Sequence, residues 1–407
     1  MHNRYVITRL VYEAKSYLVY AVFDEKLRML EVSCEAEAET GILGNIYIGR
    51  VRDIVPNLNA AFIDIGEGRT CYYSMEDYKH PLFTHKIGKK PLCIGDELAV
   101  QVAKDAVKTK FPVVTTNLNF TGRYLVLTTE RSGVGVSAKL QKDKRQALKE
   151  QFTKLLEETR SKHPDAKRFG LVVRTNAGLA DPEEILREYE SLRKEYQTFC
   201  ETVIHKTAFS LLKSAKPFYL KELEGITLGS EDEIVTDLAK VHEVLVYSGL
   251  TDTPKQLRLY TDAAYPLTKL YSIENGIREA LRERVWMKSG AYLIISPTEA
   301  LTVIDVNSGK NTSGKNAEAN FLKINKEAAV EIARQLRLRN ISGICIVDFI
   351  NMKEPAAEEE LMHTFRMELK KDRIPVQLID ITKLGLVELT RKKGKRSLAE
   401  QLQVKKS

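Results

Sequence analysis

The sequence predicts a multidomain protein of mixed α+β and α/β class, and three observations support this prediction. A chain of 407 residues, 43% of them hydrophobic, is longer than one hydrophobic core usually supports, so several domains are expected. Short strands separated by Pro, Gly and Asp turns follow one another through residues 41–121, which is typical of a small closed barrel. From Asn275 onwards, apolar strands alternate with amphipathic helices, as in an α/β layer.

Composition narrows the classes of function. The formal net charge of +8 favours an anionic partner, nucleic acid before a membrane surface. The five cysteines form no C-x-x-C pair, which is typical of reduced, idle thiols and not of a disulfide framework or a zinc site. The start of the sequence lacks the apolar core of a secretory signal, and no run of about 18 uncharged apolar residues occurs. We therefore expect a cytoplasmic protein without a membrane span.

The first 40 residues predict a β-meander. Apolar and polar residues alternate through much of this segment, and Asp24 with Glu25 provides a turn before a further strand. A meander of this size is too small to be stable alone, so we expect it to pair with a strand from later in the chain.

The strands of residues 41–121 predict a barrel of the OB kind. Barrels of this kind bind single-stranded nucleic acid through aromatic and basic side chains on one face. The candidates here are Phe62, Tyr72, Tyr73 and Lys110. In the alternative interpretation, Phe62 belongs to the core and Tyr72 is a half-buried structural residue.

Residues 122–215 combine helices with a candidate phosphate site. A lysine- and glutamate-rich helix is expected over residues 139–160, and a second helix starts where Asp181 precedes a proline. Between them, an apolar strand runs into a turn that holds Arg174 and Thr175. An arginine beside a hydroxyl and turn N–H groups makes a good phosphate cradle, although Arg174 could equally pair with a surface carboxylate.

Residues 216–282 contain short strands and helices that could complete the N-terminal meander. The part of the chain that follows them predicts the α/β layer. Strands are expected at residues 291–295, 301–309, 343–350 and 376–380, and helices at 317–339 and 355–371. In the first of these helices, apolar residues recur at steps of three and four and form one packing face: Phe321, Ile324, Ala328, Ile332 and Leu336.

Two strands of this layer end in acids, Asp305 and Asp348, and Asn307 projects to the same side as Asp305. Strands of one sheet can bring both carboxylates to one edge, where they repel each other unless they share a proton or a cation. Oxygen ligands without a nearby His or Cys suit Mg²⁺, with Mn²⁺ as a substitute, and such an ion can activate a phosphodiester for hydrolysis. The alternative is a pair of capped or salt-bridged acids with a structural role.

A competing motif follows directly. Residues 309–316 nearly match the phosphate-binding loop G-x-x-x-x-G-K-[ST], with Gly314 and Lys315 in place. Asn316 lacks the hydroxyl that such a loop uses on Mg²⁺, so nucleotide hydrolysis is the least favoured alternative and an RNA phosphate contact is preferred. The basic run of residues 390–397 predicts a solvated face or a second phosphate contact.

The chain closely resembles the ribonuclease E/G family of bacterial endoribonucleases. The resemblance rests on six segments: NLNAAFIDIG (57–66), KFPVVTT (110–116), GLVVRT (170–175), IDVNS (304–308), EIARQLRLR (331–339) and VDFINM (347–352). These segments span nearly the whole chain, so chance similarity is a poor explanation for them.

The resemblance implies roles for individual residues. Asp305 and Asp348 would bind the catalytic Mg²⁺ and Asn307 would assist at the scissile phosphate. RNA-contacting positions of the barrel match Phe62, Tyr72 and Lys110, with Tyr72 where the family usually has Phe. A pocket for a 5′-monophosphate would use the side chains of Arg174 and Thr175 and the backbone of Gly122 and Val126.

The resemblance also implies a domain plan. The expected parts are an RNase H-like layer (1–40 and 216–282), an S1 barrel of the OB group (41–121), a 5′-sensor domain (122–215), a DNase I-like catalytic domain (283–396) and a basic tail (397–407). The implied activity is Mg²⁺-dependent hydrolysis of single-stranded RNA with a 5′-monophosphate, in rRNA and mRNA processing and decay. The alternative from another class is a non-catalytic RNA-binding protein of the same fold.

The sequence departs from the family pattern in two places. The family's C-P-x-C zinc motif, which joins two protomers, does not occur before Ser407, so zinc is not predicted and any homodimer is expected to use other contacts. Near Ser137 the family often has paired arginines, whereas only Lys139 is basic here, so weaker sensing of the 5′ end is expected.

Overall fold

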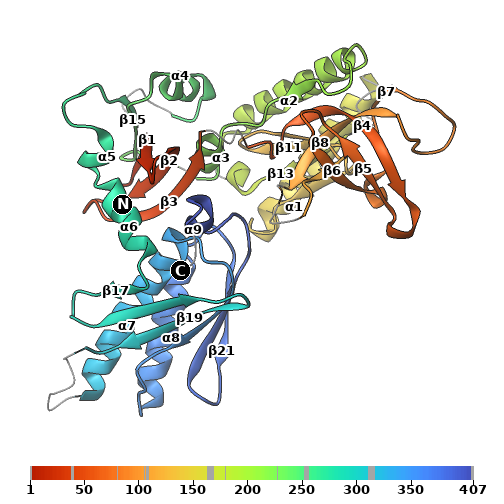
Figure 1. Ribbon diagram of the computed structural model, residues 1–407. Helices are drawn as coiled ribbons and strands as arrows, with labels where there is room; N and C mark the ends of the chain where they lie inside the picture. Colours follow the sequence, from red (N-terminus) through yellow and green to blue (C-terminus); the bar gives the residue numbers. More distant parts are fainter. Residues whose placement is uncertain are drawn as a thin grey trace. The chain divides into compact units, whose positions relative to one another are not determined.

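The computed structural model describes residues 2–37, 41–79, 81–104, 106, 110–162, 169–178, 180–226, 228–251, 256–309 and 317–404. The chain divides into two compact units, one made of Met1–Thr40 with Leu228–Ser407 and the other of Gly41–Thr227 (Figure 1). Each unit combines strands with helices, so the mixed, multidomain class predicted from the sequence is confirmed. The finer domain boundaries stay predictions.

The second unit begins with a closed five-stranded barrel. Its strands pair in the order β4, β5, β6, β9 and β8, and β4 also pairs with β8, which closes the ring. These elements are β4 (Ile46–Val55), β5 (Ala60–Asp64), β6 (Thr70–Ser74), β8 (Glu97–Lys104) and β9 (Val113–Thr115), with β7 (Phe83–His85) on β8 and the short helices η1 (Pro56–Leu58) and η2 (Met75–Asp77). Alternate residues such as Ala61, Ile63 and Val100 fill the interior. The small OB-like barrel predicted from the turn spacing is therefore present.

The rest of this unit is a four-stranded sheet covered by two long helices. The strand order is β10, β11, β13 and β12. The elements are β10 (Asn119–Thr121), β11 (Leu125–Thr128), β12 (Val134–Val136), α1 (Lys142–Lys162), β13 (Gly170–Val173), η4 (Thr175–Gly178) and α2 (Pro182–Val203). They are followed by β14 (Leu211–Lys213), which pairs with β4 of the barrel, and by α3 (Phe218–Glu224). As expected, Asp181 caps α2, accepting a hydrogen bond from the Glu183 N–H.

The first unit contains the N-terminal meander inside a five-stranded sheet of order β16, β15, β1, β2 and β3. The later partner that the meander was expected to need is β15, which pairs with β1 in parallel, Ile7 opposite Thr236. The elements are β1 (Arg4–Tyr12), β2 (Lys15–Phe23), β3 (Met29–Ala36), β15 (Glu233–Thr236), α4 (Ala239–Ser248), β16 (Leu257–Leu259), α5 (Leu267–Leu270), α6 (Ile273–Leu281) and α9 (Leu398–Gln401).

The same unit holds a six-stranded sheet of order β17, β18, β19, β20, β22 and β21. Figure 1 shows α7 and α8 along this sheet. The elements are β17 (Arg284–Trp286), β18 (Tyr292–Pro297), β19 (Leu301–Asn307), α7 (Ala317–Leu338), β20 (Gly343–Asp348), α8 (Pro355–Leu369), β21 (Val376–Ile381) and β22 (Leu386–Arg391). The predicted apolar face of α7 packs into the core through Ile324, Ala328, Ile332 and Leu336.

The cysteines are free thiols. Cys34, Cys71 and Cys345 are buried, and burial raises the pKa of the first two to about 12 and that of Cys345 to about 11. A thiol that stays protonated at neutral pH is a poor nucleophile and a poor metal ligand, so these three side chains are idle, as the composition predicts. Within the described ranges, no helix combines the length and the apolar character needed to cross a membrane.

Candidate active site

The two strand-end acids predicted from the sequence lie side by side in the six-stranded sheet. β19 and β20 pair in parallel, and their register places Asp305 directly opposite Asp348. Neighbouring strands are about 4.8 Å apart, so two ionised carboxylates at this position repel each other unless a cation or a shared proton intervenes.

Both acids point away from the core. Side chains alternate between the two faces of a strand, and the neighbours Ile304, Val306 and Val347 are buried in the cluster formed with α7 and α8. Asp305 and Asp348 therefore lie on the opposite face, where Asp305 is half-buried and Asp348 is exposed. A carboxylate pair on an open face keeps access to water and to a substrate.

Asn307 joins this pair, as the period-two spacing predicts. Its Nδ2 donates a hydrogen bond to Asp305 Oδ2 at 2.6 Å. The bond holds one oxygen of Asp305, and the second N–H of the amide group can donate to another acceptor, such as a phosphate oxygen.

The donor set at this face fits Mg²⁺. Within the described ranges, no group of three or more His, Cys, Asp and Glu side chains gathers in a metal-binding arrangement. Mg²⁺ does not require one, because it usually binds one or two carboxylates and completes its shell with water and substrate phosphate oxygens. The adjacent Asp305 and Asp348 match that requirement, while Mg²⁺ and its substitute Mn²⁺ stay predictions. Apart from Gly309, the near phosphate-binding loop of residues 309–316 lies outside the described residues.

The barrel presents an aromatic cluster on its outer surface. Phe62 and Tyr72 are direct cross-strand partners, and their rings meet edge to face at 6.2 Å between centroids. Phe62 is half-buried between the core residues Ala61 and Ile63, so it belongs to the outer face and not to the interior. Tyr73, which the sequence offered as a further candidate, is wrong for this role: it points inward, is fully buried and binds Thr116 Oγ1.

Arg174 and Thr175 lie at the end of β13, beside the loop that precedes β11. The Arg174 guanidinium donates to the Gly122 carbonyl at 2.5 Å, and the Arg174 N–H donates to the Tyr124 carbonyl at 2.8 Å. This hydrogen bond is to a backbone carbonyl and not to a surface carboxylate, and phosphate binding by Arg174 stays a prediction. Thr175 Oγ1 lies 2.8 Å from Ser137 Oγ.

Val126 lies further along the same sheet, where it is the cross-strand partner of Val172. The structure therefore links Gly122 to Arg174 by a hydrogen bond and places Val126 on the strand that follows the Gly122 loop.

Comparison with known proteins identifies the family. The family model described as "Ribonuclease E/G family" matches residues 119–394. Ribonuclease E of Nostoc sp. is 34% identical over 401 residues, covering 95% of this chain and 56% of the relative. Ribonuclease G of Escherichia coli is 31% identical over 386 residues, covering 91% of this chain and 77% of the relative. The chain belongs to the ribonuclease E/G family. It spans little more than half the length of the Nostoc ribonuclease E.

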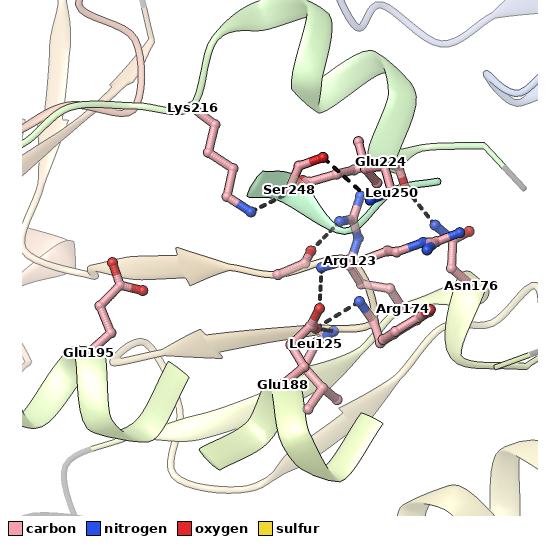
Figure 2. Close-up of polar contacts among 12 residues, drawn as sticks. Arg123, Leu125, Arg174, Asn176, Glu188, Glu195, Lys216, Glu224, Ser248 and Leu250 are labelled. Carbon is pink, nitrogen blue, oxygen red and sulfur yellow. Dashed lines mark hydrogen bonds and ion pairs between the residues drawn. The ribbon is translucent and has the colours of Figure 1, made fainter. Parts of the chain in front are cut away.

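Glu188 has a structural role in this ribonuclease E/G chain that the sequence does not predict. The Glu188 carboxylate on α2 accepts hydrogen bonds from the N–H groups of Arg123, Tyr124 and Leu125 at 2.7–2.8 Å. Figure 2 shows Glu188 beside Arg123 and Leu125. Three convergent backbone donors form an anion site, and here the chain's own carboxylate fills it. In a helix rich in Glu, Lys and Arg, nothing in the sequence distinguishes Glu188 from solvated neighbours.

The Gly122 loop is shaped around that carboxylate. A Cβ at Gly122 would lie 2.3 Å from Glu188 Oε1, so a larger residue would have to displace the anchor. The Gly122 N–H already donates to the Leu125 carbonyl at 2.8 Å. The Gly122 N–H is therefore already used within the ribonuclease E/G chain, and the assignment of Arg174 and Thr175 to a phosphate stays a prediction.

Phe111 adds a further ring to the aromatic cluster on the outer surface of the barrel. Its ring packs edge to face on Phe62 at 5.4 Å and is 53% exposed, and the preceding Lys110 is exposed. The sequence signal was present, because Phe111 follows Lys110 within one of the six shared segments. Two adjacent rings and an ammonium group form the combination that stacks bases and attracts phosphates.

Proposed function

We propose that this member of the ribonuclease E/G family is an endoribonuclease that hydrolyses phosphodiester bonds in single-stranded RNA with the help of Mg²⁺. The observation that carries the proposal is the direct cross-strand pairing of Asp305 with Asp348 on the open face of the sheet, with Asn307 bonded to Asp305. A structural role for the acids would be supported by cationic partners at short distance, and the ion pairs found in the described residues include neither of them.

The proposed mechanism assigns one task to each side chain. Asp305 and Asp348 would hold the ion, which would supply charge neutralisation at the phosphate and a lowered pKa for an attacking water. Asn307 fixes the orientation of Asp305 and directs its remaining amide N–H toward a phosphate oxygen. The reaction class is in-line hydrolysis, for which positioning of the phosphate between these groups is the main requirement.

The other surfaces would bind the RNA strand. Phe62, Tyr72 and Lys110 would contact bases and backbone on the barrel, and Arg174 with Thr175 would bind a 5′-monophosphate. The same proposal includes stimulation by the 5′-monophosphate and a role in rRNA and mRNA processing and decay. It also includes an S1-type function of the barrel, a cytoplasmic location and any homodimer without a zinc link.

A cleavage assay tests the function directly. The wild-type protein is incubated with a 5′-monophosphorylated, AU-rich single strand in Mg²⁺ and in EDTA, and products are resolved by length. Internal cleavage in Mg²⁺ that stops in EDTA is expected. Binding without cleavage in Mg²⁺ would instead support the non-catalytic RNA-binding alternative, and cleavage that continues in EDTA would exclude the metal-assisted mechanism.

Arg174→Ala is expected to remove the preference for a 5′-monophosphate. The variant loses a guanidinium that can form two charge-assisted hydrogen bonds to phosphate, so cleavage of a 5′-hydroxyl strand should be almost unchanged while the advantage of the monophosphate disappears. The measurement is the ratio of kcat/KM for the two strands. Arg187→Ala, at an exposed position of α2, is the matched control. A wild-type ratio near one would contradict the sensor assignment without affecting the nuclease assignment.

A further inference from the structure

The outer strand of the six-stranded sheet carries the only tryptophan of the chain on its surface. Trp286 in β17 is 63% exposed. An aromatic side chain that is exposed to water contributes little to the stability of the core, and exposed aromatic surface is typical of binding sites.

The strand register places Trp286 in line with the candidate active site. Trp286 is the partner of Tyr292, and Tyr292 is the partner of Asn307. The adjacent row runs from Arg284 through Ile294 to Asp305 and then to Asp348. Residues in register across a sheet share a face, so the tryptophan lies two strands from Asn307, about 10 Å away, on the face that carries the acids.

The two aromatic rings and Arg284 form one cluster on this face, with the ring planes inclined at 55° to each other. The ring centroids of Trp286 and Tyr292 are 5.0 Å apart, and the Arg284 guanidinium lies over both rings, 4.7 Å from the centroid of Tyr292 and 5.8 Å from that of Trp286. An exposed arginine on aromatic rings provides a flat surface for a base together with a cation for its phosphate.

A cationic cavity lies along the outer edge of β17, between this strand and α7. This cavity of about 810 Å³ is lined by Arg284 and Trp286 and by four further cations, Arg28, Arg282, Lys288 and Arg334, against three carboxylates. One of those carboxylates, Glu331, is paired with Arg334 at 2.5 Å. Arg28 is likewise paired with Asp24 at 2.8 Å, so the remaining cations are Arg282, Arg284 and Lys288, which outnumber the two remaining carboxylates and favour an anionic occupant.

We propose that Trp286, supported by Tyr292 and Arg284, is a stacking platform for a base of the RNA held at Asp305 and Asp348. The platform rests on the proposed function, and it adds a second base-binding surface, separate from the barrel. A second copy of the chain is the less suitable occupant, because covering this row would also cover the acids and Asn307, which must remain open to the substrate.

The single tryptophan makes the platform directly measurable. The emission of Trp286 is recorded while an unlabelled 5′-monophosphorylated AU-rich strand is added in EDTA, and binding of the same strand is followed separately by anisotropy of a labelled copy. We expect the emission to be quenched with the same midpoint as the anisotropy change, because base stacking on an indole quenches it only upon contact.

Three variants separate stacking from general effects. Trp286→Ala is expected to raise KM for RNA about fivefold or more, with a much smaller change in kcat, and Trp286→Phe should restore most of the loss, because it keeps an aromatic face. Tyr247→Ala, at an 82% exposed position of α4, is the control and should leave KM unchanged.

Each result has a defined meaning. RNA that is bound and cleaved normally, with no change in Trp286 emission and wild-type constants for Trp286→Ala, would overturn the platform and leave the proposed function intact. Emission that changes with protein concentration instead of RNA would assign the face to a second copy and would also overturn it. Wild-type protein that neither binds nor cleaves RNA would overturn the proposed function together with the platform.

Discussion

Replacing Asp305 or Asp348 with Asn is expected to reduce RNA cleavage by about 10²–10³-fold or more while leaving RNA binding largely unchanged. Each substitution removes one negative charge from a pair that the β19–β20 register holds side by side, and a neutral amide is a much weaker ligand for Mg²⁺. The measurement is the single-turnover cleavage rate at saturating protein, with binding followed by anisotropy in EDTA.

Binding of one ion by both acids also predicts how the double variant compares with the single variants. Because the acids would act on one ion, the double variant should be little worse than either single variant. Asp380→Asn, at an exposed position in β21 of the same sheet, is the control for a general loss of negative charge and should cleave normally. Normal cleavage by either active-site variant would refute the assignment.

Arg391→Met is expected to destabilise the first unit by about 3–5 kcal/mol, the largest effect on folding that we predict. Arg391 and Asp372 form an ion pair at 2.8 Å, with only 3% and 4% of their side chains exposed. The same guanidinium donates to Asn340 Oδ1 at 2.8 Å and to the Ile341 carbonyl at 3.0 Å. The substitution leaves Asp372 buried without its cation and these acceptors without a donor.

Urea unfolding followed by Trp286 emission measures this loss, because the only tryptophan reports on the unit that contains Arg391. Lys392→Met, one residue later and exposed, is the matched control and should change stability by less than about 0.5 kcal/mol. Adding Asp372→Asn to Arg391→Met should recover part of the loss, since the buried charge is then gone. Equal stability of the two single variants would contradict the prediction.

Arg391 also shows where charge patterns in a sequence mislead. The run of residues 390–397 was expected to be a solvated face or a phosphate contact, and Lys392 to Arg396 are indeed exposed. Its arginine at 391 is instead buried, because β22 pairs with β20 and turns alternate side chains into the core. Cross-strand pairing decides the side of each residue, and it cannot be deduced from local charge density.

At the candidate site, likewise, the residue types could be predicted from the sequence, whereas the strand register could not. An acid at a strand exit, with an amide two residues later, was enough to propose Asp305, Asn307 and Asp348. That Asp305 lies directly opposite Asp348 depends on how two strands align that are joined by a helix crossover, and a slip of one residue would turn one acid to the other face. Tyr73 and Tyr72 differ in the same way, since only the barrel register turns one inward.

The roles of Glu188 and Trp286 could not be predicted from the sequence for a different reason. Their roles are defined by partners remote along the chain, the backbone of residues 123–125 in one case and Asn307 two strands away in the other. A glutamate in a charged helix and a tryptophan in a short strand each have many ordinary explanations, and only tertiary contacts select among them.

The parallel pairing of β1 with β15 has a consequence for biosynthesis. The meander of β1, β2 and β3 leaves the ribosome early, whereas the strand that covers the free edge of β1 is translated roughly 200 residues later. At about 5–20 residues per second, that edge waits about 10–40 s for its partner. An uncovered strand edge is a template for intermolecular pairing, so the nascent chain has a period of aggregation risk that ends only when β15 docks. Rapid folding of the inserted Gly41–Thr227 unit does not shorten that interval, because β15 is translated only after this unit. The speed of translation through the insertion is therefore a determinant of soluble yield.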